Sequence, residues 1–169
     1  AETIGGAFVK ISLTSENHLN PFDLPKPQEG ENPADILRSN IINLVGLLRI
    51  MFGGLTPEED ALIDTAITQT YASRDTTPTM SDLKTILDSM AGAESLSRRL
   101  EKYVSGSYAG FLNNPTNVEI SARGGSASGG KNKLVVFSIR DMEEELRPVA
   151  MYIILHFIWN LVRSELKKR

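Results

Sequence analysis

The chain has 169 residues, 41% of them hydrophobic and 23% charged, which indicates one globular domain and argues against wholesale disorder. Its net charge of -3 excludes a global attraction to nucleic acid or to anionic membranes, so any such contact would need a local basic patch. The absence of cysteine excludes disulfides and thiolate metal sites, and it favours a reducing compartment.

One strongly apolar stretch covers residues 149–162. It is shorter than the roughly 20 apolar residues that a membrane-spanning helix needs, and it contains His156 and Asn160. We therefore expect a buried core helix and no transmembrane segment. The first residues show no signal peptide, and the missing initiator Met suggests a piece of a longer protein.

The first expected element is a strand over residues 6–12, where apolar and polar residues alternate after a glycine pair. Residues 20–33 contain four prolines and predict a loop, because proline removes a backbone donor and restricts the residue before it. The chain is thus expected to leave a strand through a loop before its helical part begins.

Four helices are expected next. The first begins at Pro33 and shows helical spacing of apolar residues up to Gly53 and Gly54, which favour a C-terminal stop. The second has Thr56 as its N-cap, followed by a proline and three acidic residues that suit the positive end of the helix dipole.

The third expected helix is capped by Ser81 and runs to Met90, and the fourth covers residues 93–104. A turn rich in Asn and Gly follows at residues 108–115. Residues 121–132 contain four glycines and almost no apolar side chain, so they are typical of a flexible linker, either natural or engineered.

A second strand is expected at residues 133–140, and its continuous apolar run is typical of a strand covered on both faces in a parallel sheet. After Asp141 the chain becomes helical, and Pro148 should start or kink a long final helix. Two strands alone do not form an independently stable sheet. We therefore expect both strands to belong to a larger sheet.

This order of elements predicts a mainly α fold, or an α-rich α/β fold, in which a bundle of helices is inserted between two strands and a long helix ends the chain. No internal repeat is present. The expected parts are a strand with its loop at 1–24, an all-helical domain at 33–115, the linker at 121–132, and a strand with the long helix at 133–169.

The sequence lacks the motifs that would support catalysis. No GxxxxGK[ST] phosphate-binding loop occurs, and no glycine pair has the GxGxxG spacing, so nucleotide binding by this chain alone is not expected. The histidines His18 and His156 belong to no HExxH or comparable cluster, so no metal is expected. Because no GxSxG elbow is present either, no catalytic residue and no cofactor is assigned.

Two polar residues at the end of the second strand are candidates for a place near nucleotide. Ligands of open α/β sheets gather beyond the carboxyl ends of the strands, so Arg140 and Asp141 would face a nucleotide crevice if further strands completed the sheet. An ordinary ion pair, or a helix N-cap by Asp141, is the simpler interpretation. The acidic run 143–145 is interpreted as complementing the dipole of the following helix.

Two small basic clusters are candidate contacts for a partner or for nucleic acid. The first consists of Arg98, Arg99 and Lys102 on the fourth expected helix. The second includes Lys167 and Lys168 at the end of the last helix. A solvated helix face is the default interpretation of both clusters.

Several stretches resemble one family in sequence and in order. They are GGAFVKISLTSENHLNPFDL, LTPEEDALID, GFLNNPTNV and KLVVFSIRDMEEELRPVAMYIILHFIWNLVRSE. Together they resemble the large ATPases that energise type IV secretion and conjugative DNA transfer, the VirB-four, TrsE and TraC class. The resemblance covers nearly the whole chain except residues 121–132, although none of its motifs is a catalytic signature.

The resemblance implies a RecA-like P-loop core into which an all-helical domain is inserted. The Walker A loop of the family would precede residues 1–24 and its Walker B strand would follow Arg169, so this chain would contain neither motif. ATP and Mg are therefore implied for the longer protein and not for this chain. The resemblance places that longer protein in the bacterial cytoplasm, at the inner face of the membrane, as an oligomer working with components of the secretion channel.

Two functions follow as expectations. The first is a helical interaction domain of such a motor, with no nucleotide hydrolysis of its own. The alternative is a small helical DNA-binding module that uses the basic patches and whose affinity would fall steeply with salt. A stand-alone enzyme would need a perturbed acid–base pair in a pocket, and the sequence offers no candidate pair. The apolar run 134–137 also predicts oligomerisation or borrowed strands.

Overall fold

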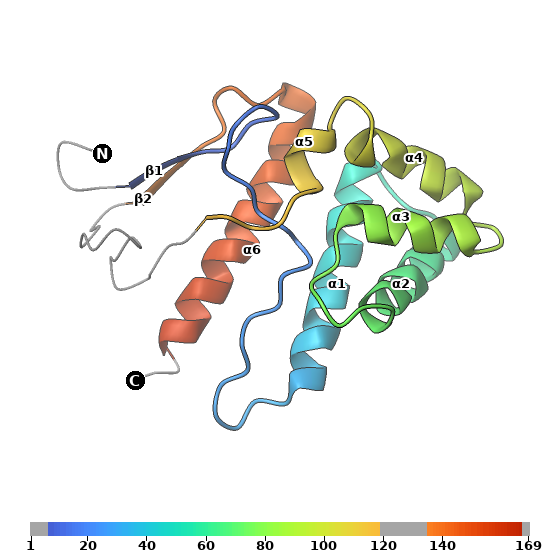
Figure 1. Cartoon of the computed structure of the whole chain (residues 1–169), viewed down its shortest axis with the longest axis horizontal. Coiled ribbons are helices and arrows are strands. Elements are labelled where there is room, and N and C mark those ends of the chain that lie inside the picture. The colour runs from blue at the N-terminus through green and yellow to red at the C-terminus, as the bar shows by residue number, and fades with distance from the viewer. Residues whose placement is uncertain (1–6, 119–134, 167–169) are drawn as a thin grey trace. The chain divides into compact units, whose positions relative to one another are not determined.

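The computed structural model of the chain describes residues 7–118 and 135–166 (Figure 1). Backbone contacts divide the chain into two compact units. One unit comprises Ala1–Leu19 with Thr116–Arg169, and the other is Asn20–Pro115. The described elements are mostly helices, which confirms the predicted mainly α class.

The first unit contains a pair of parallel strands. Strand β1, Ala7–Lys10, pairs with strand β2, Val135–Ser138, and Phe8 lies opposite Val136 in the register. A further bond from the amide of Ile11 to the carbonyl of Ser138, 2.9 Å long, extends the ladder. Two strands and a parallel sheet were expected, but pairing of these two strands with each other was not part of the prediction. The described residues of β2 are only partly buried, so the expected cover on both faces is not seen in the described part of the chain.

A long helix follows the second strand. A short 3-10 turn, Glu144–Leu146, leads into helix α6, Arg147–Leu166. Pro148 lies at the start of α6, where its missing N–H costs nothing, because the first amides of a helix have no partner within it. The ring of Phe157 on α6 packs edge-on against Phe137 of β2, with 6.1 Å between their centroids.

The expectation that the stretch 149–162 is a buried core helix is wrong for its second half. All four buried residues of α6 lie before residue 155, and they are Val149, Ala150, Ile153 and Ile154. Leu155 and Trp159 are 57% and 61% exposed. The reason is geometric, because strands of four residues reach about 13 Å whereas a 20-residue helix is about 30 Å long. No helix in the described part of the chain is long and apolar enough to cross a membrane.

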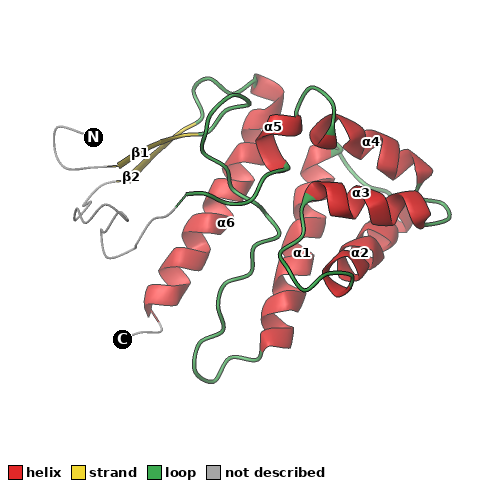
Figure 2. Ribbon diagram, viewed as in Figure 1, coloured by secondary structure: helices red, strands yellow, loops and turns green. Residues whose placement is uncertain are grey.

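The second unit is helical (Figure 2). Its helices are α1 (Pro33–Met51), α2 (Pro57–Ala72), α3 (Met80–Ser89), α4 (Glu94–Val104) and the short α5 (Ala109–Leu112). Each helix packs against the next one along the chain. Their inner faces form the core, and its fully buried members include Leu44, Leu47, Leu48, Ile63, Ile67, Met80, Leu83, Leu87, Leu96 and Leu100. The helical domain expected at 33–115 falls within this unit.

The start of α2 follows the prediction. The hydroxyl of Thr56 accepts the amide of Glu59 at 3.2 Å, and the Glu59 carboxylate accepts the amide of Thr56 at 3.0 Å, which closes a capping box. The stop of α1 is also as expected, since Gly53 and Gly54 adopt φ angles of 70° and 123° that other residues rarely adopt.

Two local predictions are wrong. Helix α3 begins at Met80 and is not capped by Ser81, because the Asp82 carboxylate reaches back to the amide of Thr79 at 2.8 Å and fixes an earlier start. The amide of Ser81 instead donates to Asn113 Oδ1 at 2.9 Å. The turn expected at 108–115 contains the single helical turn α5. The linker expected at 121–132 lies outside the described residues.

Candidate functional site

The carboxyl end of the strand pair holds an ion pair. The Nζ atom of Lys10, the last residue of β1, lies 2.6 Å from Oδ2 of Asp141. The hydrogen bond from Lys10, and then its charge, hold the pKa of Asp141 below the usual value. Arg140 is exposed and its charge lowers the same pKa further. Asp141 is therefore a member of an ion pair, as in the simpler interpretation of this residue.

A buried hydroxyl lies next to this ion pair in the sequence. Ser12 follows β1, is only 4% exposed, and its Oγ atom has no hydrogen-bond partner among the described residues. A buried polar group without a partner costs free energy, so this position is unusual for a purely structural serine. No local pattern in the sequence singles out Ser12, because nothing near it predicts burial of its hydroxyl.

Arg99 on α4 is engaged inside its own unit. Its guanidinium lies 2.7 Å from the Glu59 carboxylate, donates to the carbonyl of Phe52 at 2.6 Å, and donates to the carbonyl of Gly54 at 3.1 Å. It also stacks over the Phe52 ring, 4.7 Å from the centroid. These contacts join α4 to the turn between α1 and α2. The charge of Arg99 is therefore compensated by groups of its own unit.

The other two basic residues of this cluster differ from Arg99. Arg98 is exposed on the surface of α4. Lys102 is exposed as well, and its ammonium lies 5.5 Å and 5.0 Å from the ring centroids of Tyr103 and Tyr108. These three cations are neighbours in the sequence, but their surroundings differ. Arg98 and Lys102 are exposed, whereas Arg99 is partly buried.

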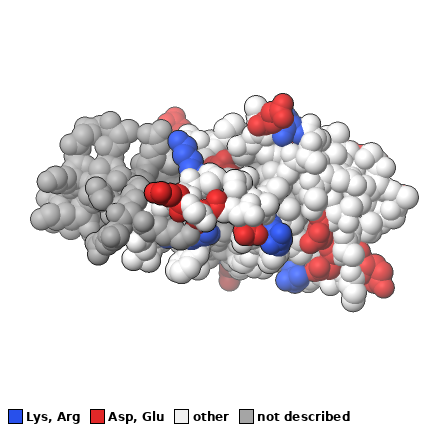
Figure 3. All heavy atoms as spheres, turned by 90° about the horizontal axis from the view of Figure 1, so that it is seen from below, with Lys and Arg blue, Asp and Glu red and all other residues white. Residues whose placement is uncertain are grey.

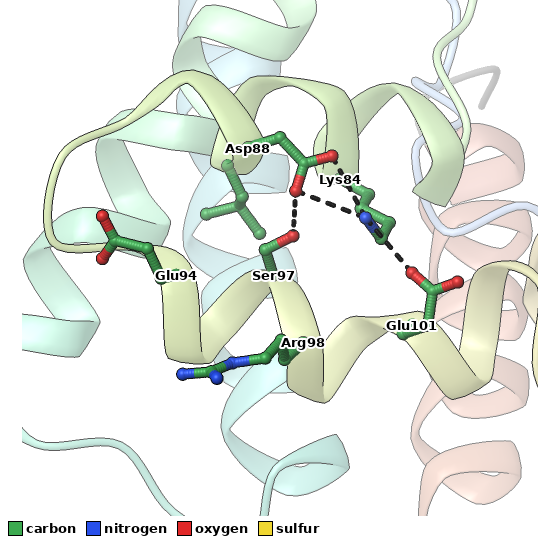
Figure 4. A pocket seen from close by; sticks show the side chains of 7 residues that line it. Lys84, Asp88, Glu94, Ser97, Arg98 and Glu101 are labelled. Carbon is green, nitrogen blue, oxygen red and sulfur yellow. Dashed lines mark hydrogen bonds and ion pairs between the residues drawn. The ribbon is translucent and has the colours of Figure 1, made fainter.

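A groove of about 670 Å³ lies between α3 and α4 (Figure 4). Its floor includes the buried Leu87, and the polar residues that line it are Lys84, Asp88, Glu94, Ser97, Arg98 and Glu101. In the figure, dashed lines connect the carboxylates of two of these residues to the single lysine between them, whereas Arg98 carries no such line. The groove therefore combines an internally paired network with one exposed guanidinium.

Lys84 is the centre of this network. Its ammonium lies 3.1 Å from Asp88 and 3.1 Å from Glu101. The bond to Asp88, followed by the bond to Glu101, raises the pKa of Lys84. The Ser97 hydroxyl is the main cause of the lowered pKa of Asp88, and the Ser105 hydroxyl is the main cause of the lowered pKa of Glu101. Lys84, Asp88 and Glu101 are thus each stabilised in the ionised form, which suits binding and not proton transfer.

The charges on the surface are mixed. On the face drawn in Figure 3, basic and acidic side chains alternate and no large patch of one sign appears. Within residues 7–118 and 135–166, no group of three His, Asp or Glu side chains is placed to hold a metal ion. A uniformly basic surface for phosphate backbones is thus not visible on this face.

The segments that lead into and out of the helical unit are joined by hydrogen bonds of Asn117. Residues 16–18 together with Asn117 are here called the neck. Asn117 Oδ1 accepts the amide of His18 at 2.6 Å, and the amide of Asn117 donates to the carbonyl of His18 at 3.1 Å. The Asn117 side-chain amide also donates to the carbonyl of Glu16. The chain therefore leaves the first unit and returns to it at neighbouring points. Nothing near Asn117 in the sequence indicates this role, because its partners lie about 100 residues away.

The predicted site residues do not form one cluster. Arg140 and Asp141 belong to the unit of the strand pair, whereas Arg98, Arg99 and Lys102 belong to the helical unit. Lys167 and Lys168 lie outside the described residues. The roles assigned to these residues from the sequence stay predictions, with Arg99 the one whose contacts are most clearly structural.

Comparison with known proteins adds one finding. No protein-family model and no curated protein matches the sequence. Among solved structures, VirB4 of Thermoanaerobacter pseudethanolicus matches with a TM-score of 0.76 and 19% sequence identity, over 96% of this chain. The chain covers 64% of that VirB4 chain. The chain therefore shares the fold of VirB4 over nearly its whole length, and the resemblance predicted from the sequence is confirmed at the level of the fold.

Proposed function

We propose that this chain is part of a motor ATPase that energises type IV secretion or conjugative DNA transfer, and that it contributes a helical interaction domain together with strands of the nucleotide-binding core. The fold shared with VirB4 across 96% of the chain is the observation that carries the proposal. The longer protein is proposed to be cytoplasmic and to work at the inner face of the membrane, with channel components and copies of itself as partners.

The geometry of the neck supports an inserted domain. The helical unit begins at Asn20 and ends at Pro115, and on either side of it Asn117 binds the backbone of His18. A domain whose entry and exit lie together can be carried by a core without interrupting the core's own pairing of β1 with β2. This is the arrangement expected when a helical block is inserted into an α/β core.

The proposed division of labour assigns nucleotide chemistry to residues outside this sequence. The chain has no phosphate-binding loop, and its ionised network on α3 and α4 suits contact with a partner. ATP and Mg would be bound by the longer protein. Arg140 and Asp141, at the carboxyl end of the strand pair, are proposed to lie close to that nucleotide.

Arg98 and Lys102 are proposed to contact a partner protein. Both are exposed on α4, and Arg98 borders the groove between α3 and α4. A DNA-binding module, the alternative function, would need more cations on one surface. The engagement of Arg99 with Glu59 and two carbonyl groups removes one member of the cluster on which that alternative depends.

Deletion of residues 34–114 from the longer, gene-encoded protein tests the proposal. The neck lies outside the deleted segment, so a short Gly-Ser link should leave the core folded. We expect transport to be lost, and the rate of ATP hydrolysis or the oligomeric state to change. Unchanged ATP turnover, oligomerisation and secretion would contradict an interaction role for the helical unit.

Two controls separate this function from its alternative. The double variant Arg98→Ala with Lys102→Ala should reduce transport and lower the melting temperature only slightly, through loss of the Lys102 contacts with Tyr103 and Tyr108. The 169-residue chain should release no phosphate from ATP, and it should not bind DNA even at low salt. Strong, salt-sensitive DNA binding by this chain would favour the DNA-binding module.

A further inference from the structure

The chain is fixed to the helical unit well before its first helix begins. Nδ2 of Asn20 donates to the carbonyl of Pro78 at 2.8 Å, and Oδ1 of Asn20 accepts the amide of Phe22 at 3.1 Å. Asn20 is only 6% exposed and Phe22 is fully buried. A buried side-chain amide needs such partners, because leaving it unpaired costs free energy. Residues 20–22 therefore belong to the core of the helical unit, although α1 begins only at Pro33.

Two helices hold these residues as well. The hydroxyl of Tyr71 on α2 donates to the carbonyl of Phe22 at 2.6 Å. The side-chain amide of Asn40 on α1 donates to this hydroxyl at 2.7 Å and to the carbonyl of Pro21 at 3.3 Å. Burial raises the pKa of Tyr71, so its hydroxyl keeps the proton that it donates. Both ends of the proline-rich loop at residues 20–33 are thus fixed to the helical unit.

The segment that leaves the helical unit is fixed near the same point. Oδ1 of Asn113 accepts the amide and the hydroxyl of Ser81, at 2.9 Å and 3.0 Å, and Nδ2 of Asn113 donates to the hydroxyl oxygen of Ser81 at 2.7 Å. Pro78 and Ser81 flank Met80, the first residue of α3. The first and last segments of the helical unit are therefore both bound to residues 78–81 at the start of α3, here called the α3 anchor.

Only short segments separate the α3 anchor from the neck. The neck binds His18 on the entering segment to Asn117 on the returning segment. Between the neck and the α3 anchor lie Leu19 on the entering segment and residues 114–116 on the returning segment. A few loop residues can absorb the backbone rotation of a domain hinge, and the fixed φ angle of Pro115 limits the directions available to the returning segment. The two units are thus connected by two short segments with a hydrogen-bonded clamp at each end.

We propose that the helical unit, with its proline-rich loop, turns as one body about a hinge formed by Leu19 and residues 114–116. Helix α3 starts at the α3 anchor and lines the groove with Lys84, Leu87 and Asp88, so turning about this hinge displaces the groove without any change in the packing of the bundle. The purpose of this displacement, to move a bound partner, rests on the proposed function. The position of the hinge rests on the hydrogen bonds and on the boundary between the units.

The alternative joint is the proline-rich loop itself, and spin labels distinguish the two. The chain has no cysteine, so introduced cysteines can be labelled in pairs, and the distances between them can be measured by double electron–electron resonance. Ile42→Cys with Leu155→Cys has one label in each unit, and Leu24→Cys with Ile42→Cys has one label in the loop and one on α1. All three side chains are exposed. Ile42→Cys with Ser95→Cys, inside the helical unit, is the reference pair.

The widths of the distance distributions locate the hinge. We expect the Ile42–Leu155 distribution to be several-fold broader than the reference, and the Leu24–Ile42 distribution to be as narrow as the reference. A Leu24–Ile42 distribution as broad as that of the Ile42–Leu155 pair would place the joint in the proline-rich loop and overturn the proposal. An Ile42–Leu155 distribution as narrow as the reference would overturn it too, because the units would then not turn.

A matched pair of asparagine variants tests the α3 anchor. Asn20→Ala should broaden the Leu24–Ile42 distribution several-fold, because it removes the bond to Pro78. Asn17→Ala removes a bond from a side-chain amide to the carbonyl of Lys10, 2.9 Å long, on the other side of the hinge, so it should leave that distribution narrow. Equal widths in the two variants would contradict the role of Asn20 in positioning the loop. These measurements need neither secretion nor ATP turnover, so transport that survives deletion of residues 34–114 would contradict the proposed function and leave the hinge intact.

Discussion

Neighbouring cations on α4 have different roles because their side chains contact different groups. Arg99 holds Glu59 and the carbonyl groups of Phe52 and Gly54, whereas Arg98 is exposed beside the groove. Loss of charged hydrogen bonds of this kind costs about 2 kcal/mol, so Arg99→Ala should lower the free energy of unfolding by roughly that amount. Arg98→Ala should change it by less than about 0.5 kcal/mol. Urea unfolding followed by circular dichroism measures both, and equal effects would contradict the structural role of Arg99.

The same contacts predict how stability depends on pH. The hydrogen bond from the Thr56 amide is the main cause that lowers the pKa of Glu59 below its ordinary value of 4.5, and Arg99 adds to it. A lowered folded-state pKa means that Glu59 stabilises the fold above pH 4.5, and that this contribution is lost as the pH falls through the folded-state pKa.

Substitution of this carboxylate measures the effect. Glu59→Gln should flatten the dependence of the unfolding free energy on pH below 4.5, compared with the unchanged chain. Glu58→Gln is the matched control, because it removes a carboxylate from the same helical turn. Urea titrations at a series of acidic pH values provide the data, and a slope that Glu59→Gln leaves intact would exclude Glu59 as a contributor.

At the scale of elements, the capping box of α2 is the clearest local signal. Its hydroxyl bond should be worth about 1 kcal/mol, so Thr56→Ala should lower the unfolding free energy by that amount. Thr65→Ala, at an exposed position within the same helix, should have a small effect of the opposite sign because alanine favours helix. Thermal unfolding of both variants measures the two effects. Equal destabilisation would mean that the Thr56 cap makes no specific contribution to stability.

Local signals of this kind explain which parts of the fold were predictable. Glycines after α1, the cap of α2 and the apolar run of β2 act within a few residues, so the sequence alone predicts those elements. The pairing of β1 with β2 joins segments more than 120 residues apart, and no local signal predicts it. The start of α3 was placed too late, because Ser81 and Asp82 both suit a helix start and only the Asp82 side chain turns back. Apolar periodicity on α6 could not distinguish a buried face from an exposed one.

The candidate site was less predictable, because its contacts are not local. Arg99 reaches backbone groups more than 40 residues away, and its neighbours Arg98 and Lys102 look equivalent in the sequence. The ion pair of Asp141 with Lys10 could be expected only as a general possibility for a residue at a strand end. Each of these contacts depends on how distant segments pack together, which composition and spacing do not determine.

At the scale of the whole molecule, Asn117 lies where the chain returns from the helical unit to the first unit. It makes hydrogen bonds to the backbone of His18 and Glu16, and it forms them across about 100 residues of chain. Asn117→Ala removes the side-chain bonds, so the His18 amide should lose protection from hydrogen exchange, and the unfolding free energy should fall by about 1 kcal/mol. Asn117→Asp keeps an acceptor for His18 and removes the donor to Glu16, so it should retain protection at His18.

The matched control is Asn114→Ala, whose side-chain amide donates a long hydrogen bond, 3.5 Å, to the carbonyl of Gly110 in α5. It should leave exchange at His18 unchanged. On the proposed function, Asn117→Ala should also reduce transport more than ATP turnover in the longer protein. If hydrogen exchange at the His18 amide stayed slow in Asn117→Ala, contacts other than the Asn117 side chain would hold the neck together.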